Sequence, residues 1–266
     1  MAFLPTVLLG AIAGLTIYLG LPIARLRNPS KMLQVFLNSL ATGILIFLFW
    51  DIVSKASEPI HEALGSAQKG DPGQFIFLLL IFAAGLGIGL MGLVYFDMLV
   101  IRRRRREKEA PPRSVSPLQI SLMIAIGIGM HNFSEGLAIG QASATGAISL
   151  ATILIVGFGA HNATEGFGIA GPLTSSAQPP SWRYIGMAGL IGGGPTFLGT
   201  ILGYSLHSEW IFVLFLALAA GSIIYVVTEL LHVGRSFGIR DLPMWGILLG
   251  FLLGYCTDLI LTWAGV

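Results

Sequence analysis

The chain of 266 residues carries the pattern His-Asn-x-x-Glu-Gly twice, from His131 to Gly136 and again from His161 to Gly166. On a helix, residues four positions apart lie on one face, a single turn from each other. If the two copies face each other, His131, Glu135, His161 and Glu165 converge on one point. Two imidazoles and two carboxylates suit zinc, ferrous iron or manganese, and two carboxylates neutralise a divalent cation.

The asparagine beside each histidine is rotated by about 100° around the helix axis. Asn132 and Asn162, with the carboxylates bridging, form a candidate second metal site next to the first. The alternative interpretation is structural, because single polar residues often lock two membrane helices together by a hydrogen bond. We favour a functional site because the pattern occurs twice.

The composition shows which solvent surrounds these motifs. Hydrophobic residues make up 55% of the chain and charged residues 11%, whereas soluble domains have about 25% charged residues. We therefore expect an all-α integral membrane protein. Cys256 is the only cysteine, so a single chain forms neither a disulfide framework nor a thiolate zinc site, and the metal ligands must be nitrogen and oxygen atoms.

Crossing a bilayer as a helix takes about 20 predominantly apolar residues. Eight such stretches are predicted, within a single polytopic domain over 1–266, and they lie at 3–24, 35–54, 74–101, 117–141, 147–171, 184–205, 210–234 and 243–264. His131 and His161 each lie about 21 Å into their spans at 1.5 Å per residue, which is the middle of the membrane. Ionisable residues at that depth are costly and mark ion pathways.

The distribution of basic residues predicts the topology. One set of alternate loops holds thirteen Lys and Arg residues and the other holds two, Lys55 and Lys69. Seven of the thirteen lie between Arg102 and Arg113. By the positive-inside rule, both termini lie outside the cell membrane and loop 102–116 is cytoplasmic. We interpret this basic run as a topology anchor that contacts anionic lipid, not as a nucleic-acid site.

An inverted repeat is also predicted. Residues 41–43 (Ala-Thr-Gly) are followed by Asp51, and residues 219–221 (Ala-Ala-Gly) are followed by Glu229 at the same spacing. Spans one to three would then repeat as spans six to eight around the central pair, a 3+2+3 arrangement. Asp51 and Glu229 become outer and inner attraction points for a cation. The alternative is that they are interfacial carboxylates at helix ends.

The paired motifs, eight spans and outside termini resemble the ZIP family of divalent-metal transporters. The resemblance implies a binuclear site with His131, Glu135, His161 and Glu165 as ligands of one ion, and Asn132 and Asn162 beside a second. It also implies that Asp51 lies at the outer entrance, that Glu229 lies in the inner exit path, that metal moves into the cytoplasm, and that the protein forms a homodimer.

The chain departs from the family pattern in three places. Ser134 and Thr164 stand where many members have proline before the motif glutamate. Residues 43–47 (GILIF) and 192–197 (GGGPTF) lack the sulfur and carboxylate ligands that some bacterial members add. The cytoplasmic loop contains no histidine.

We therefore expect transport of a divalent metal, Zn²⁺ first, with iron, manganese or cadmium as further substrates and no organic cofactor. Two alternatives remain at this stage: a membrane metalloenzyme that uses the same His and Glu residues, and a receptor that binds metal without moving it. The pairs Glu58/His61 and Glu229/His232 have the spacing of a di-iron motif, but the predicted topology places them on opposite sides of the membrane.

Overall fold

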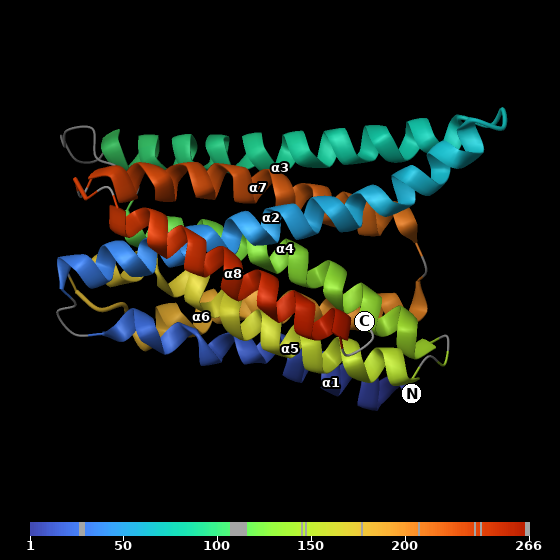
Figure 1. Cartoon of the computed structure of the whole chain (residues 1–266), viewed down its shortest axis with the longest axis horizontal. Coiled ribbons are helices and arrows are strands. Elements are labelled where there is room, and N and C mark those ends of the chain that lie inside the picture. The colour runs from blue at the N-terminus through green and yellow to red at the C-terminus, as the bar shows by residue number, and fades with distance from the viewer. Residues whose placement is uncertain are drawn as a thin grey trace.

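A computed structural model describes residues 1–26, 30–106, 116–144, 146, 148–176, 178–206, 208–236, 238–239 and 241–263. These residues form helices and turns and contain no strand. The helices run along the long axis of one bundle, with both chain ends toward the same side of it (Figure 1). In chain order they are α1 (Phe3–Leu15), the 3-10 helices η1 (Thr16–Leu19) and η2 (Leu21–Arg25), α2 (Lys31–Ala67), α3 (Gly73–Arg106), α4 (Pro117–Ala144), α5 (Ile148–Ala170), the 3-10 helix η3 (Pro172–Ser175), α6 (Trp182–Ser205), α7 (Glu209–Ser236) and α8 (Asp241–Trp263).

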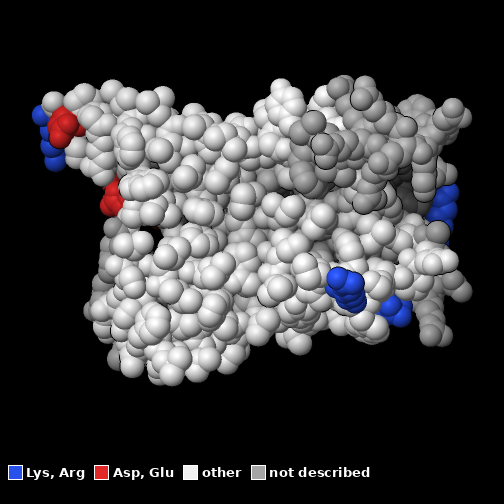
Figure 2. Space-filling view, turned by 180° about the vertical axis from the view of Figure 1, so that it is seen from behind, with Lys and Arg blue, Asp and Glu red and all other residues white. Residues whose placement is uncertain are grey.

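All eight predicted spans fall on these helical segments. Seven segments among the described residues are long and apolar enough to cross a membrane, and the 23 residues of α5 provide the eighth. Large apolar side chains such as Leu4, Leu80, Leu190 and Trp245 are exposed around the bundle. On the face shown in Figure 2, the described charged side chains lie toward the two ends of the bundle, with an uncharged region between them. The prediction of an all-α membrane protein is confirmed.

The first span is not a uniform α-helix. Helix α1 ends at Leu15, and the chain continues to Arg25 in 3-10 geometry. Pro22 lies at the start of η2, and because proline has no N–H it cannot continue an α-helical hydrogen-bond ladder.

Helix α2 is much longer than the predicted 35–54. It spans 37 residues, begins after Ser30, whose Oγ accepts from the Leu33 backbone N at 3.2 Å, and continues through Pro59 to Ala67. The prediction placed Asp51 near the end of its span and Lys55 in a loop, and both placements are wrong. The charged residues after Phe49 end the hydropathy signal, but they do not end the helix.

The first residues of the predicted basic segment 102–116 are helical, because α3 continues to Arg106. Residues 107–115 lie outside the described residues, as do the side chains of residues 101–106.

The packing of the helices follows the predicted inverted repeat. In this repeat α1, α2 and α3 correspond to α6, α7 and α8, and α4 corresponds to α5. The contact between α2 and α8 should therefore have a counterpart between α7 and α3. The contact between α1 and α5 should have one between α6 and α4. All four contacts are present. The pairs α1 and α6, α2 and α7, and α4 and α5, which map onto themselves, are also in contact.

Two glycines of the paired motifs allow neighbouring segments to approach the central helices closely. A methyl group on Gly136 would overlap the backbone carbonyl oxygen of Thr196 in α6, and one on Gly166 would overlap that of Ile17 in η1. The motif glycines therefore place α6 against α4 and the 3-10 segment of the first span against α5.

Candidate metal centre

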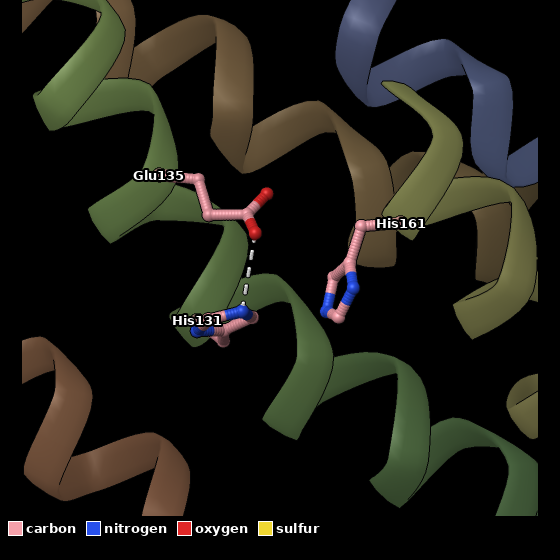
Figure 3. Close-up of side chains that lie close together, drawn as sticks. All are labelled: His131, Glu135 and His161. Atoms are coloured by element: carbon pink, nitrogen blue, oxygen red, sulfur yellow. Dashed lines mark ion pairs between the residues drawn. The ribbon is translucent and has the colours of Figure 1, made fainter. Parts of the chain in front are cut away.

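The candidate centre lies between α4 and α5. His131 and Glu135 lie one turn apart on α4, with His131 Nε2 3.2 Å from Glu135 Oε1. His161 of α5 faces them (Figure 3), and its ring centroid is 6.0 Å from that of His131. One ligand atom from each of these three side chains lies within 4.8 Å of the others, and all three residues are buried. The predicted convergence of the two motifs therefore occurs for these three residues.

Apart from the contact between His131 and Glu135, the nitrogen and oxygen atoms of this group that could bind a cation have no hydrogen-bond partner among the described residues. Among the described residues, none donates or accepts a hydrogen bond at either ring nitrogen of His131 or His161, or at Glu135 Oε2. Buried polar atoms normally have a partner because leaving them unpaired is costly. Ligand atoms around tetrahedral zinc lie about 3.4 Å apart, since the bonds are about 2.0–2.2 Å long. Shifts of about 1 Å per side chain would close the group around such an ion.

Glu165 lies beside this group. Its side chain is fully buried, and its Oε1 is 3.6 Å from His161 Nε2. Its Oε2 accepts a hydrogen bond from Asn132 Nδ2 at 3.0 Å, and the same amide nitrogen donates to the backbone carbonyl of Gly192 in α6, also at 3.0 Å. Asn132 therefore connects α4, α5 and α6 at the depth of the centre.

Asn162 points a different way. Its Nδ2 donates to the backbone carbonyl of Ala13 in α1 at 3.1 Å, and its buried Oδ1 accepts no hydrogen bond from the described residues. In this arrangement the side chain anchors α5 to α1. Thr164, which replaces the proline common in the family, donates from Oγ1 to the His161 carbonyl at 2.7 Å.

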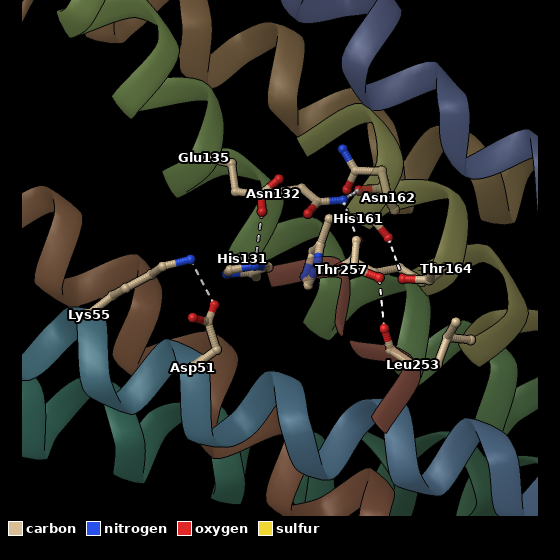
Figure 4. Close-up of polar contacts among 12 residues, drawn as sticks. Asp51, Lys55, His131, Asn132, Glu135, His161, Asn162, Thr164, Leu253 and Thr257 are labelled. Atoms are coloured by element: carbon tan, nitrogen blue, oxygen red, sulfur yellow. Dashed lines mark hydrogen bonds and ion pairs between the residues drawn. The ribbon is translucent and has the colours of Figure 1, made fainter. Parts of the chain in front are cut away.

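Asp51 lies close to the centre and forms an ion pair that the sequence analysis missed. Phe47, one turn earlier on α2, has its ring centroid 6.3 Å from that of His161. The Asp51 carboxylate points toward His131 and binds Lys55, with Nζ 2.8 Å from Oδ2 (Figure 4). The spacing of Asp51 and Lys55 by four residues was the available signal, because that spacing favours ion pairs on a helix.

Glu229 lies far from this group. It is half-buried on α7, whereas the α7 residues that line the cavity beside His131 are Phe212 and Leu216. Glu229 is thirteen positions after Leu216 along the helix, which is about 20 Å at 1.5 Å per residue. The structure thus brings together Asp51, His131, Glu135, His161 and Glu165 and leaves Glu229 toward the other end of α7.

Comparison with known proteins decides the family. The pattern of the ZIP zinc transporter family matches residues 103–256, which include both motifs. The chain belongs to the ZIP family. Three similar proteins are zinc transporters ZupT of Escherichia coli: those of strain O127:H6, 30% identical, and of strains O7:K1 and O1:K1, 29% identical. Each alignment covers 97% of this chain and 98% of the relative.

Membership of the ZIP family favours one of the three functional interpretations. The family and these ZupT relatives are transporters of divalent metal, not enzymes. Together with the apolar helices, this makes the protein a multi-pass membrane transporter and discounts the metalloenzyme interpretation.

Proposed function

We propose that the protein carries Zn²⁺ toward the cytoplasm through the centre between α4 and α5. The observation that carries the proposal is the buried group of His131, Glu135 and His161, whose ligand atoms lie within 4.8 Å of one another. Glu165 completes the first coordination sphere by a small movement past His161, from which it is 3.6 Å away. Two carboxylates balance the charge of the ion, which lowers the cost of holding it at that depth.

The two asparagines have different roles in this proposal. Asn132 holds Glu165 in place, and its Oδ1 accepts no hydrogen bond from the described residues, so it can turn toward a second ion. Asn162 would join a second site only after releasing the Ala13 carbonyl. One resident ion with a transient second one fits these contacts. The same donor set admits iron, manganese or cadmium with lower preference.

Asp51 is the carboxylate that an ion meets before the centre, and Glu229 lies on the inner path. In this orientation both termini and the α2–α3 turn lie outside, and the segment after Arg106 is cytoplasmic and contacts anionic lipid. The homodimer stays a prediction from the family resemblance.

The test is zinc uptake into proteoliposomes loaded with a zinc-sensitive dye. His131→Ala and Glu165→Ala should each lower uptake more than tenfold, because each removes a ligand of the transported ion. His61→Ala and Glu62→Ala are matched controls on the exposed end of α2 and should keep wild-type uptake. Monodisperse elution of every variant excludes misfolding. Normal uptake by both centre variants would disprove the proposal, and uptake that saturates at a fixed zinc-to-protein ratio would indicate a receptor.

A further inference from the structure

A lysine lines the cavity that leads to the centre. The cavity has a volume of about 220 Å³, and its lining includes Lys55, Glu58, His131, Glu135, Phe158 and Asp258. Ala138 and Phe212 line it as well, and both also line a second cavity of about 720 Å³. The second cavity lies between the ends of α2, α3, α4 and α7, where Gln74 Nε2 donates to Glu209 Oε2 at 3.1 Å. The two cavities therefore adjoin at Ala138 and Phe212, and the smaller one reaches His131 and Glu135.

The ammonium group of Lys55, which lines the smaller cavity, is bound to the carboxylate of Asp51 one turn earlier on α2. Lys55 Nζ lies 2.8 Å from Asp51 Oδ2, and the Asp51 side chain is only 7% exposed whereas that of Lys55 is 35% exposed. The carboxylate is therefore held inside the protein and the ammonium reaches it from the wider space. An incoming cation meets an Asp51 that already has a positive partner.

Two features beside Lys55 favour its release from Asp51. Pro59 lies inside α2, four residues after Lys55. Because proline has no N–H, the Lys55 backbone carbonyl lacks its helical hydrogen bond, which weakens α2 at this turn. The ring of Phe158 lies 5.9 Å from Lys55 Nζ, and an aromatic face is a second favourable position for an ammonium group.

We propose that Lys55 is a specificity-determining residue, a tethered monovalent cation that occupies Asp51 and that a divalent ion displaces. This inference rests on the proposed function. The tethered ammonium group competes for the Asp51 carboxylate at an effective concentration of about 1 mM or more. A sodium or potassium ion carries the same charge as the ammonium, so it binds this carboxylate no more strongly and does not displace the lysine. A divalent ion carries twice the charge and is therefore attracted more strongly to Asp51. Glu135 and the imidazoles of His131 and His161 are then available as further ligands.

Lys55→Met tests the proposal by removing the ammonium group while keeping an unbranched side chain of nearly the same length. We expect the KM for zinc uptake to fall about fivefold, the factor that corresponds to about 1 kcal/mol for a partly exposed ion pair. We also expect about 0.1 M external Na⁺ to raise the KM of this variant severalfold relative to choline at equal ionic strength, which holds screening constant. Wild-type protein should show no difference between Na⁺ and choline. Lys55→Arg should keep this indifference, and Lys69→Met is the control for loss of a lysine at an exposed position.

Asp51→Asn shows whether Lys55 acts through Asp51. In that background Lys55→Met should not change the KM further, because there is no carboxylate left to compete for. Lys55→Gln is measured in parallel and decides the question if Lys55→Met fails to fold, since its amide can still donate to Asp51.

An unchanged KM and unchanged Na⁺ response in folded Lys55→Met or Lys55→Gln would overturn the inference. Loss of uptake in both, with uptake kept by Lys55→Arg, would also overturn it, because the lysine would then support transport instead of competing with the ion. Neither result touches the proposed function, which stands or falls on wild-type uptake and on the His131 and Glu165 variants.

Discussion

Asn132→Ala should destabilise the protein more than any other single asparagine-to-alanine change whose contacts are described here. The side chain is fully buried and donates two hydrogen bonds, one to the Glu165 carboxylate and one to the Gly192 carbonyl, both at 3.0 Å. The substitution leaves both acceptors buried without this donor, and the three helices that they connect lose a polar tie.

The expected loss in the free energy of unfolding is about 2–3 kcal/mol. In soluble proteins each buried group left unpaired costs about 1–3 kcal/mol, so two such groups would predict a larger loss. Hydrogen bonds between membrane helices average about 0.6 kcal/mol and reach about 1.7, because unfolded helices in the bilayer find other partners. The bond to the carboxylate belongs at the top of that range, since charge strengthens it, and the bond to Gly192 near the average. Burial of the orphaned carboxylate accounts for the remainder.

The assay is equilibrium unfolding by denaturing detergent in mixed micelles, followed by circular dichroism. Asn38→Ala is the matched control: this side chain is also fully buried, but its Nδ2 makes a single bond, to the Leu230 carbonyl at 3.2 Å. It should cost about 0.6 kcal/mol. Equal losses in the two variants, or a loss below about 0.5 kcal/mol for Asn132→Ala, would refute the assignment of Asn132 as the connector of three helices.

Two further predictions concern packing and topology. Gly136→Ala should lower the free energy of unfolding by about 1–3 kcal/mol, because the added methyl group would overlap the backbone of α6. Gly65→Ala has open space around it and should be neutral or stabilising. Unfolding in denaturing detergent measures both, and equal effects would contradict the close contact at Gly136. In a variant without the native cysteine, Lys69→Cys should react with a membrane-impermeant maleimide on intact cells. Arg235→Cys should react only after permeabilisation, since the positive-inside rule places the two positions on opposite sides of the membrane. Labelling of Arg235→Cys on intact cells would reverse the proposed orientation.

The sequence alone predicted the proximity of the His and Glu side chains well, because that proximity depends on local geometry. Four-residue spacing on a helix brings His131 next to Glu135 and His161 next to Glu165, and both pairs are present at 3.2 and 3.6 Å. That the two motifs face each other required only two antiparallel neighbouring helices. The eight spans followed from apolar stretches of sufficient length.

The length of α2 was not predictable from hydropathy. Hydropathy detects residues solvated by lipid, but α2 continues past Asp51 because Ile52, Ala56 and Ile60 form a buried apolar stripe along it, while polar residues such as Glu58 are exposed. Placing Lys55 in a loop hid its ion pair with Asp51.

Sequence by itself therefore determined the fold class, the eight apolar stretches and the candidate ligand residues, since these depend on composition and on periodicity along one helix. Tertiary structure decided which polar atoms meet across helices. It directs the amide of Asn132 to Glu165 and Gly192, and that of Asn162 to Ala13. It also places Lys55 in the wall of the cavity beside His131 and Glu135. These choices depend on the rotation and depth of neighbouring helices, which glycine contacts such as that of Gly136 with Thr196 set and which no spacing within a single helix encodes.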